Sequence, residues 1–292
     1  MSILDKLDNK QILLSDGAWG TFLQATGLKP GECPELWNIT HREEVLKIAE
    51  SYVKAGSDII ETNSFGGSIF KLSQYGLADR VYELNKAAAE ISRAAAGKER
   101  HVAGSLGPTG KMLIMGDVTE EELYSAFREQ AVALEAGGAD IIIIETMSAL
   151  DETALAVRAA KENTACVIIV TMTFDGDQLS GYNTMMGVSP AEMVTAMKDA
   201  GADIVGSNCG NGIENMIGIV KEIRKTDSNF PVMIQANAGV PEYIDGKTVF
   251  RESPEMMASF VPALIEAGAN IIGGCCGTTP EHIKEIRKVI RK

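Results

Sequence analysis

The sequence predicts an α/β protein folded as a single (β/α)8 TIM barrel domain over residues 1–292. Two observations support this fold class: a short phrase that recurs four times, and four further apolar runs that lie between the repeats. Together they give eight strands separated by helical segments, the number of a closed barrel. A doubly wound open sheet is the alternative, but it normally has fewer units and a clearer phosphate loop.

The recurring phrase joins Gly, a small residue and Asp or Asn to a run of β-branched residues, at 55–60, 137–142, 200–205 and 267–272. Each copy follows a helical pattern, which indicates a helix that ends at glycine and turns into a buried strand. The other four apolar runs are 11–15, 101–105, 166–171 and 231–235. Because these runs are continuous rather than alternating, we expect a parallel sheet covered on both faces.

Helix starts fall between the predicted strands. Thr119 and Ser189 each precede a glutamate by three residues, the spacing of a capping box. Ser253 and Thr279 each stand before a proline, which is favoured at the first helical position. No composition break or linker divides the chain, so one domain is expected.

The composition excludes several classes of function. The net charge of −13 argues against binding to nucleic acid or to an anionic membrane. Five cysteines without a periodic framework favour a reducing compartment, and no apolar run has the ~20 residues that span a bilayer. With no signal-peptide pattern at the start, we expect a soluble cytoplasmic protein.

In such a barrel the functional groups lie at the carboxyl ends of the strands. The predicted strands end in polar or reactive residues, which should converge on one mouth: Asp16, Glu61, Ser105, Glu145, Cys209, Asn237 and Cys275. The longest loops, residues 174–188 and 238–252, also follow strands and are expected to cover this mouth.

Three cysteines carry the chemistry. Cys209 ends one strand, and Cys275 and Cys276 end another, with glycines beside them that let the backbone bend. Barrel closure brings these distant positions together. Small buried structural cysteines are the alternative, which the adjacent pair disfavours. Three thiolates with an open fourth position describe a catalytic rather than a structural zinc site, with one zinc per chain.

The charge of this site selects the reaction. Zinc with three thiolates carries a net charge of −1, so it is a poor Lewis acid but can still deprotonate an incoming thiol. Alkyl transfer to that thiol is the natural use. His41, His101 and His282 are placed too poorly to serve as ligands, and we interpret them as surface or packing residues. Cys33 and Cys166 also lie outside the predicted ring.

Other strand ends fit an amino-acid substrate. Glu145 ends the most hydrophobic strand, where a carboxylate requires a partner such as a substrate ammonium, or hydrogen bonds from neighbouring loops. Asp16 is either a site residue or the N-cap of the next helix. Backbone N–H groups near Gly17 and Ala18 are candidates to receive a carboxylate. The glycine-rich segment 104–110 is only weak evidence for phosphate binding.

These residues resemble the zinc-dependent homocysteine S-methyltransferases, a family that includes the homocysteine-binding module of cobalamin-dependent methionine synthase and betaine–homocysteine methyltransferase. The resemblance covers nearly the whole chain. It rests above all on the paired cysteines at 273–280 with the upstream Asn-Cys pair at 208–209. Supporting motifs lie at 16–21, 61–65, 107–108, 145–146 and 237–239.

The resemblance implies that Cys209, Cys275 and Cys276 bind zinc, and that Glu145 and the 16–17 turn hold the amino-acid end of homocysteine. It also implies that Asn237 lies close to the metal. Two residues depart from the family pattern: Trp19 stands where methionine is usual, and Ala236 where proline is frequent. Both lie near the expected mouth, so donor or thiol preference is expected to differ from that of a standard methionine synthase.

We expect no folate-binding, cobalamin-binding or reactivation module, because the sequence stops one helix after the cysteine pair. The methyl donor would then come from outside: a separate methyl-corrinoid protein, or a small sulfonium such as S-methylmethionine. The predicted reaction is methyl transfer to homocysteine, giving methionine. The alternatives are a corrinoid-linked methyltransferase component that uses another thiol or donor, and a non-catalytic zinc-binding subunit.

Overall fold

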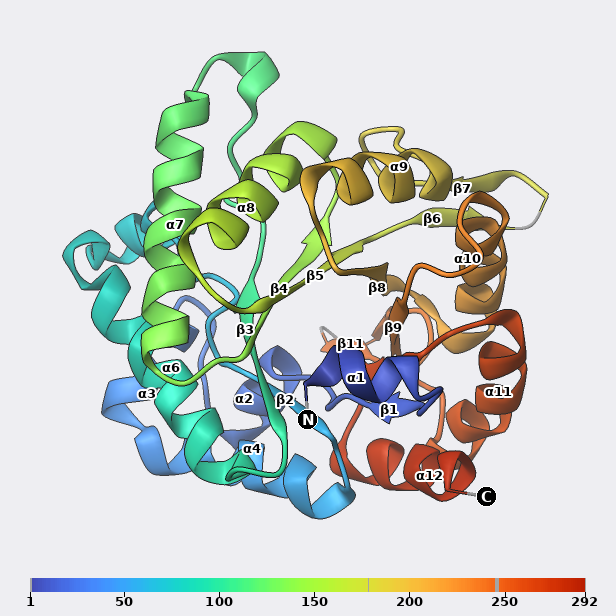
Figure 1. Cartoon of the computed structure of the whole chain (residues 1–292). Coiled ribbons are helices and arrows are strands. Elements are labelled where there is room, and N and C mark those ends of the chain that lie inside the picture. Colours follow the sequence, from blue (N-terminus) through green and yellow to red (C-terminus); the bar gives the residue numbers. More distant parts are fainter. Residues whose placement is uncertain (1, 178, 245–246, 292) are drawn as a thin grey trace.

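Eight parallel strands curl into a barrel surrounded by helices in the computed structural model, which describes residues 2–177, 179–244 and 247–291 (Figure 1). The strands lie in the order β1-β12-β9-β8-β5-β4-β3-β2, and the Asp58 N–H donates to the Leu14 carbonyl at 2.7 Å, which brings β2 beside β1. The strands are β1 (Leu13–Leu14), β2 (Ile59–Glu61), β3 (His101–Leu106), β4 (Ile141–Met147), β5 (Val167–Met172), β8 (Ile204–Gly212), β9 (Val232–Asn237) and β12 (Ile271–Gly274).

The eight-stranded barrel confirms the predicted fold class. Residues 1 and 292, at the ends of the predicted domain, lie outside the described residues. The two loops expected to cover the mouth each contain a short antiparallel hairpin: β6 (Asp175–Asp177) with β7 (Gly181–Asn183), and β10 (Glu242–Ile244) with β11 (Lys247–Val249). Positions 178 and 245–246 in these loops also lie outside the description.

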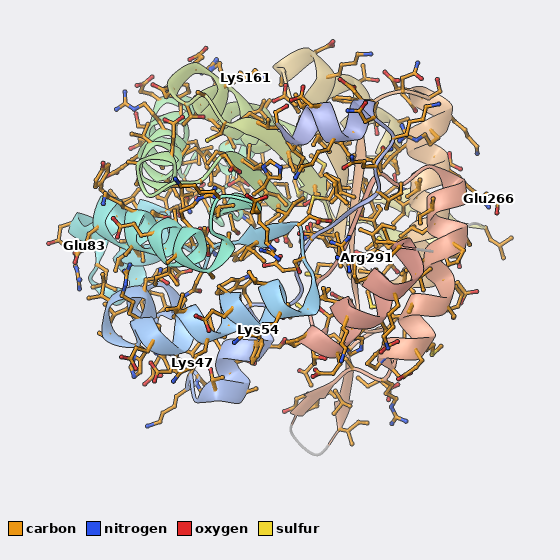
Figure 2. All side chains as sticks on the ribbon, turned by 60° about the horizontal axis from the view of Figure 1, so that its bottom comes forward. Lys47, Lys54, Glu83, Lys161, Glu266 and Arg291 are labelled. Carbon is orange, nitrogen blue, oxygen red and sulfur yellow. The ribbon has the colours of Figure 1, made fainter. Side chains whose placement is uncertain are left out.

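Helices follow the strands and form the outer layer, as Figure 1 shows. Their bounds are α1 (Ile3–Asp8), α2 (Gly20–Thr26), α3 (Trp37–Thr40), α4 (Arg42–Ala55), α5 (Ile69–Leu72), α6 (Val81–Ala96), α7 (Glu120–Ala136), α8 (Leu150–Asn163), α9 (Pro190–Ala200), α10 (Ile213–Thr226), α11 (Pro254–Ala267) and α12 (Pro280–Ile290). The predicted starts are confirmed, with capping boxes at Thr119 and Ser189 and proline in the first turn of α9, α11 and α12. Figure 2 shows charged side chains such as Lys47, Lys54 and Lys161 at the outer edge of this layer.

The barrel interior is apolar at the amino ends of the strands. Its inward side chains pack against Ile3 and Leu7 of α1, which lies across this end of the barrel: Ile59, Ala103, Ile143, Ile169, Ile204, Met233 and Ile271. All seven are buried. A larger apolar cluster fills the space between the strands and the outer helices. Burying these side chains supplies the main driving force for folding.

The interior turns polar toward the carboxyl ends. Because side chains alternate across a strand, the inward positions above the apolar layer lie two residues further along, or four in β8. They are Glu61, Ser105, Glu145, Thr171, Asn208 and Gln235, all buried. This polar layer is the floor of the mouth, and it places the functional groups where the fold predicts them.

Each copy of the recurring phrase makes the same polar contact at the amino end of the barrel, and we call these four contacts the clasp. The Asp or Asn side chain of each phrase accepts a backbone N–H near the start of the preceding strand. Asp140, for example, accepts the Val102 N–H at 3.0 Å. A basic side chain from a neighbouring helix then pairs with the same group, as Arg93 does with Asp140 at 2.7 Å. The other three pairs are Arg287 with Asp58, Lys161 with Asp203 and Arg224 with Asn270.

Within the described part of the chain, no helix combines the length and apolar character needed to cross a membrane.

Candidate metal centre

Cys209, Cys275 and Cys276 meet at the carboxyl end of the barrel. Their sulfur atoms all lie within 4.8 Å of one another, and the Cys209 and Cys276 sulfurs are 4.0 Å apart. Cys209 lies in β8, and the pair directly follows β12. All three side chains are partly exposed, so a ligand can reach them. The structure therefore brings together the three cysteines that the sequence predicted.

Irregular backbone aims these sulfurs. Cys209 has a φ of 59°, and the pairing of β8 with β9 shifts register between Asn208 and Gly212. A β-bulge re-aims a side chain in this way and is common beside functional sites. Cys275 donates its N–H to Ala236 at 2.7 Å, and this bond fixes the pair against β9. Positive φ in a non-glycine residue costs of order 1–3 kcal/mol, which the surrounding sheet must offset.

The three sulfurs share negative charge unequally. Hydrogen bonds from Cys275 and Cys276 lower the pKa of Cys209, and a further bond from Asn237 acts in the same direction. The same contacts with Cys209 raise the pKa of both Cys275 and Cys276. One thiolate is therefore favoured without a metal, and a divalent cation is required to hold all three as thiolates.

These donors fit zinc. Among residues 2–177, 179–244 and 247–291, this triad is the one group of three or more His, Cys, Asp or Glu residues with ligand atoms so close together. Soft thiolate ligands select zinc over hard cations, and three protein ligands leave a position for substrate. The triad is therefore a three-cysteine zinc-type site of the open kind.

The histidines have local roles, in agreement with their interpretation from the sequence. His41 stacks on Trp37 with ring centroids 4.2 Å apart. His101 lies at the opposite end of the barrel, with its Nδ1 3.5 Å from Asp140 Oδ1. His282 completes a capping box with Thr279 at the start of α12.

A cavity of about 280 Å³ opens beside the three sulfurs. Acidic side chains lie in its wall, including Glu61 and Glu145, and no lysine or arginine lines it among the described residues. Trp19 and Phe65 add aromatic surface. A buried carboxylate without a cationic partner is costly, so this wall favours a ligand that carries positive charge.

Glu145 sits at the centre of a hydrogen-bond network. Ser105 donates to one carboxylate oxygen at 2.5 Å, and Asn208 donates to the other at 3.1 Å. Burial raises the pKa of Glu145 to about 7, against the opposing hydrogen bond from Ser105. The Asn208 amide also approaches the Cys275 sulfur at 3.9 Å, so it links the carboxylate to the cysteine cluster.

Asp16 is buried and fully engaged by its own neighbours. One oxygen accepts the Glu61 N–H at 2.8 Å and the Trp19 indole N–H at 3.0 Å, and Ser15 donates to the other at 3.3 Å. Burial raises the pKa of Asp16 to about 7. The alternative role of Asp16 as an N-cap is wrong, because α2 is capped at Trp19 without a side-chain bond.

The turn after β1 packs against the loop that follows the cysteine pair. Thr278 accepts the Ala18 N–H at 3.0 Å and donates to the Cys275 carbonyl at 2.7 Å. A side chain at Gly17 would lie only 2.7 Å from the Thr278 hydroxyl, so glycine is required there. The Ala18 N–H, predicted as available to a carboxylate, is therefore already hydrogen-bonded to Thr278.

Sequence reasoning placed Glu61 at the mouth without a role, and it missed Gln235. Glu61 is buried beside Gln235, whose amide donates to it at 2.5 Å from the far side of the barrel. Burial raises the pKa of Glu61 well above its usual value, and the charge of Glu145 adds to this. The alternation of inward positions is the signal that identifies both residues. Asn237 is also buried, and its side-chain amide oxygen, Oδ1, finds no hydrogen-bond partner among the described residues.

The fold and the site together define a TIM-barrel protein with an open three-cysteine zinc-type site. The family model for homocysteine S-methyltransferases matches residues 13–290, and the chain belongs to this family. This match confirms the resemblance seen in the sequence motifs. It also makes the protein a methyltransferase by family.

Individual relatives agree with this assignment. The chain is 30% identical over 302 residues to the methionine synthase of Mycobacterium tuberculosis, and the match covers 99% of the chain and 25% of the relative. The methionine synthase of Mycobacterium leprae is 28% identical, with 97% and 24% covered. The chain thus spans about a quarter of the length of these enzymes.

The fold also matches a solved structure. The metallated form of the homocysteine methyltransferase MmuM from Escherichia coli superposes with a TM-score of 0.80 at 23% identity, with 99% of each chain covered. This likeness supports the barrel architecture.

Proposed function

We propose that this protein transfers a methyl group to the thiol of homocysteine and forms methionine, with the methyl donor supplied from outside the chain. One observation carries the proposal: three sulfurs within 4.8 Å of one another border a cavity whose charged wall is acidic. Homocysteine offers a thiol for the first feature and an ammonium for the second. The family assignment supports the same substrate.

The cysteine cluster serves the thiol. Bound zinc would supply a site that deprotonates a thiol at neutral pH, as metals do for coordinating thiols. Two features hold the three ligands in place: the backbone hydrogen bond from Cys275 to Ala236, and the register shift beside Cys209 in β8. Asn208 and Asn237 donate hydrogen bonds toward this cluster and stabilise its negative charge.

The acidic wall serves the ammonium. Glu145 and Glu61 face the cavity from neighbouring parts of the polar layer, and both have a raised pKa because of burial. An ammonium between them would offset the cost of ionising these groups. We assign Asp16 a positioning role, because its carboxylate already accepts the Glu61 N–H in β2 and the Trp19 indole N–H in the turn after β1. The substrate carboxylate would lie against this turn at Gly17, since the Ala18 N–H is already hydrogen-bonded to Thr278.

The donor is a separate molecule: a methyl-corrinoid protein or a small sulfonium. Three unbridged, partly exposed cysteines side by side favour a reducing compartment, which supports a cytoplasmic location. A corrinoid-linked component that uses another thiol is the second candidate function. Trp19 lines the thiol cavity and Ala236 accepts the Cys275 N–H, so these two departures from the family pattern lie where they could change the preferred thiol or donor.

Methyl transfer is tested with the zinc-loaded protein, homocysteine and each donor in turn, with methionine measured by mass spectrometry. We expect methionine with one donor and none after Cys275→Ala, while Cys166→Ala, a buried cysteine outside the cluster, keeps its activity. Methionine formation by Cys275→Ala would contradict the site. Methylation of another thiol in preference to homocysteine would favour the second candidate.

A further inference from the structure

The loop that contains the β10–β11 hairpin ends at Glu252, and this residue contacts three segments that meet beside the cysteine cluster. Its N–H donates to the Ala238 carbonyl at 2.9 Å, just after β9. Its carbonyl accepts a hydrogen bond from His282 Nε2 in α12 at 3.0 Å. Its side chain lies against Gly212, the last residue of β8. One residue therefore joins β8, β9 and α12.

The contact with β9 leads to the cysteine pair. Ala238 donates its N–H to the Cys276 carbonyl at 3.0 Å, while its own carbonyl accepts the Glu252 N–H. Cys275 donates its N–H to the Ala236 carbonyl, two residues earlier in the chain than Ala238. Both cysteines of the pair are thus hydrogen-bonded to the carboxyl end of β9, and Glu252 fixes the last residue of that stretch.

The contact with α12 holds the segment after the pair. Thr279 donates its N–H to His282 Nδ1 at 3.1 Å, so the ring proton is on Nε2, which donates to the Glu252 carbonyl. Phe250 packs on the same segment, since a side chain at Gly277 would collide with its ring. The end of the hairpin loop therefore covers the backbone that follows Cys276.

The contact with β8 lies three residues after Cys209. Gly212 is also the N-cap of α10, so this helix has no side-chain cap from its own N-cap residue. A Cβ at Gly212 would lie only 2.5 Å from a Glu252 carboxylate oxygen. The carboxylate thus lies over the N-terminus of α10, where negative charge is favoured. Burial raises the pKa of Glu252, and the Ile213 N–H acts against this rise.

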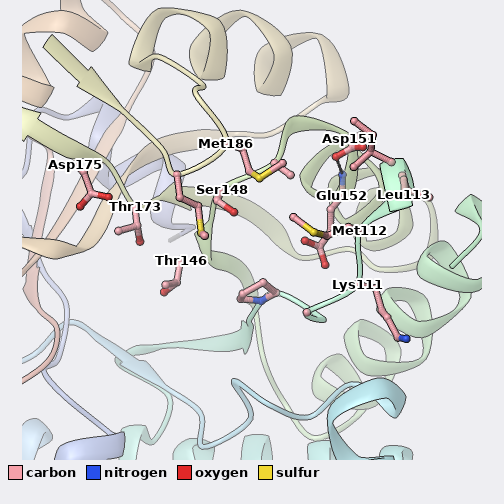
Figure 3. A pocket seen from close by; sticks show the side chains of 15 residues that line it. Lys111, Met112, Leu113, Thr146, Ser148, Asp151, Glu152, Thr173, Asp175 and Met186 are labelled. Carbon is pink, nitrogen blue, oxygen red and sulfur yellow. Dashed lines mark hydrogen bonds between the residues drawn. The ribbon is translucent and has the colours of Figure 1, made fainter. Parts of the chain in front are cut away.

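The residue before Cys209 is held from another direction. Thr173 donates to the Asn208 carbonyl at 3.0 Å, and Figure 3 shows Thr173 beside Asp175 at the edge of a separate cavity. Cys209, with its positive φ, therefore lies between the Thr173 contact and the Glu252 contact. Of these two contacts, the one with Glu252 extends to the segment of the cysteine pair.

We propose that Glu252 is a positioning residue for the cysteine cluster. It fixes the segment of Cys209 relative to the segment of Cys275 and Cys276, so that the three sulfurs converge before a metal binds. The proposal rests on the metal site of the function proposed above. Contacts outside the ligands orient the groups that bind a metal, and their loss typically weakens metal binding by about 10–100-fold.

The stability of the fold gives a weaker reason for this side chain. Glu252 Oε2 is buried and finds no hydrogen-bond partner among the described residues. An unpaired buried oxygen is costly, and this cost opposes the favourable charge at the N-terminus of α10. We therefore expect the Glu252 side chain to affect the geometry of the sulfurs more than the free energy of unfolding.

Zinc affinity of the reduced, metal-free protein tests the proposal without turnover, by competition with a chromophoric chelator. We expect Glu252→Ala to bind zinc about ten-fold more weakly than the wild type. Glu252→Gln keeps an acceptor oxygen at the same reach and should stay within about three-fold. Glu214→Ala is the matched control, because it removes an exposed carboxylate from the first turn of the same helix, and it should leave the affinity unchanged.

Gly212→Ala tests the same contact from the other side and does not depend on the folding of Glu252→Ala. Its methyl group would displace the carboxylate, so we expect a similar loss of zinc affinity. Combined with Glu252→Ala, it should add little further loss, because both changes break one contact. Cobalt(II) in place of zinc gives a second readout. Its thiolate charge-transfer absorption should change in Glu252→Ala, whereas a change in stability alone would not alter it.

Urea unfolding of each metal-free variant measures the stability of the fold separately. The proposal is overturned if Glu252→Ala binds zinc as tightly as the wild type, or if Glu214→Ala loses as much affinity. Additive losses from Gly212→Ala and Glu252→Ala would also overturn it. Lower stability with unchanged zinc affinity and cobalt absorption would leave Glu252 only a structural role. Wild-type protein that binds no zinc through its cysteines would instead contradict the proposed function.

Discussion

The indole N–H of Trp19 donates to the buried Asp16 carboxylate at 3.0 Å, and the same oxygen accepts the Glu61 N–H at 2.8 Å. These two hydrogen bonds connect the turn after β1 to the carboxyl end of β2. They also explain how the tryptophan at this position is accommodated. The residue is a departure in sequence, but in the structure it satisfies a buried carboxylate.

Trp19→Phe should lower the free energy of unfolding by about 1 kcal/mol, because it removes one of the two N–H donors to a buried carboxylate oxygen. In an Asp16→Asn background the same substitution should cost less, since the interaction with the carboxylate is already changed. Urea unfolding of the two single variants and the double variant measures this coupling. Equal costs in both backgrounds would show that Trp19 acts through packing alone.

Glu61→Gln should weaken homocysteine binding about ten-fold, because an ammonium loses one of its two carboxylate partners. Binding of 4-mercaptobutanoate, which lacks the amino group, should not change. Calorimetry with both thiols measures the difference, and Glu43→Gln, at an exposed position on α4, is the control. An equal loss for both thiols would mean that Glu61 acts on the fold rather than on the ammonium.

The free energy of unfolding should fall as pH rises from about 5 to 7 in the ligand-free protein. Burial raises the pKa of Glu145 from 4.5 to about 7, so the folded state binds more protons than the unfolded state across this window. A pKa difference of one between the folded and unfolded states corresponds to about 1.4 kcal/mol. Glu145→Gln removes this group, and its stability should depend less on pH. A wild-type stability that rises over the window, with Glu145→Gln unchanged in slope, would contradict the assignment.

Asp140→Ala should cost about 1–2 kcal/mol of stability, because the Val102 N–H loses its acceptor and Arg93 its partner. Asp140→Asn is the matched control and should cost less, since an asparagine, Asn270, already fills the equivalent position before β12. Thermal unfolding compares the two. A similar loss in both variants would indicate that the charge, rather than the acceptor, matters in the clasp.

The sequence was sufficient for the barrel and its cysteines, because both leave local signals. The repeated phrase marks every second strand, and its glycines end the helices, as Gly56 and Gly201 do with φ of 105° and 97°. The adjacent cysteines between glycines are also a local signal, because the whole motif lies within a few residues. Burial on both faces made the strands readable as continuous apolar runs.

The remainder of the site depends on register and on contacts between distant segments. Glu61 and Gln235 are 174 residues apart and meet only because their strands face each other across the barrel. The hydrogen bond between Ala18 and Thr278 joins residues 260 positions apart, so no local sequence pattern predicts it. The N-cap alternative for Asp16 failed because the following turn separates it from α2, whose cap is Trp19.

We propose above all that three cysteines hold one zinc and leave a position for the thiol of homocysteine. Zinc-edge X-ray absorption on the reduced protein, with and without homocysteine, tests this most directly. We expect three sulfur ligands and one lighter atom in the free protein, and four sulfurs once homocysteine is added. Three sulfurs that remain unchanged with homocysteine would reject this thiol, and a zinc spectrum without sulfur ligands would contradict the metal site itself.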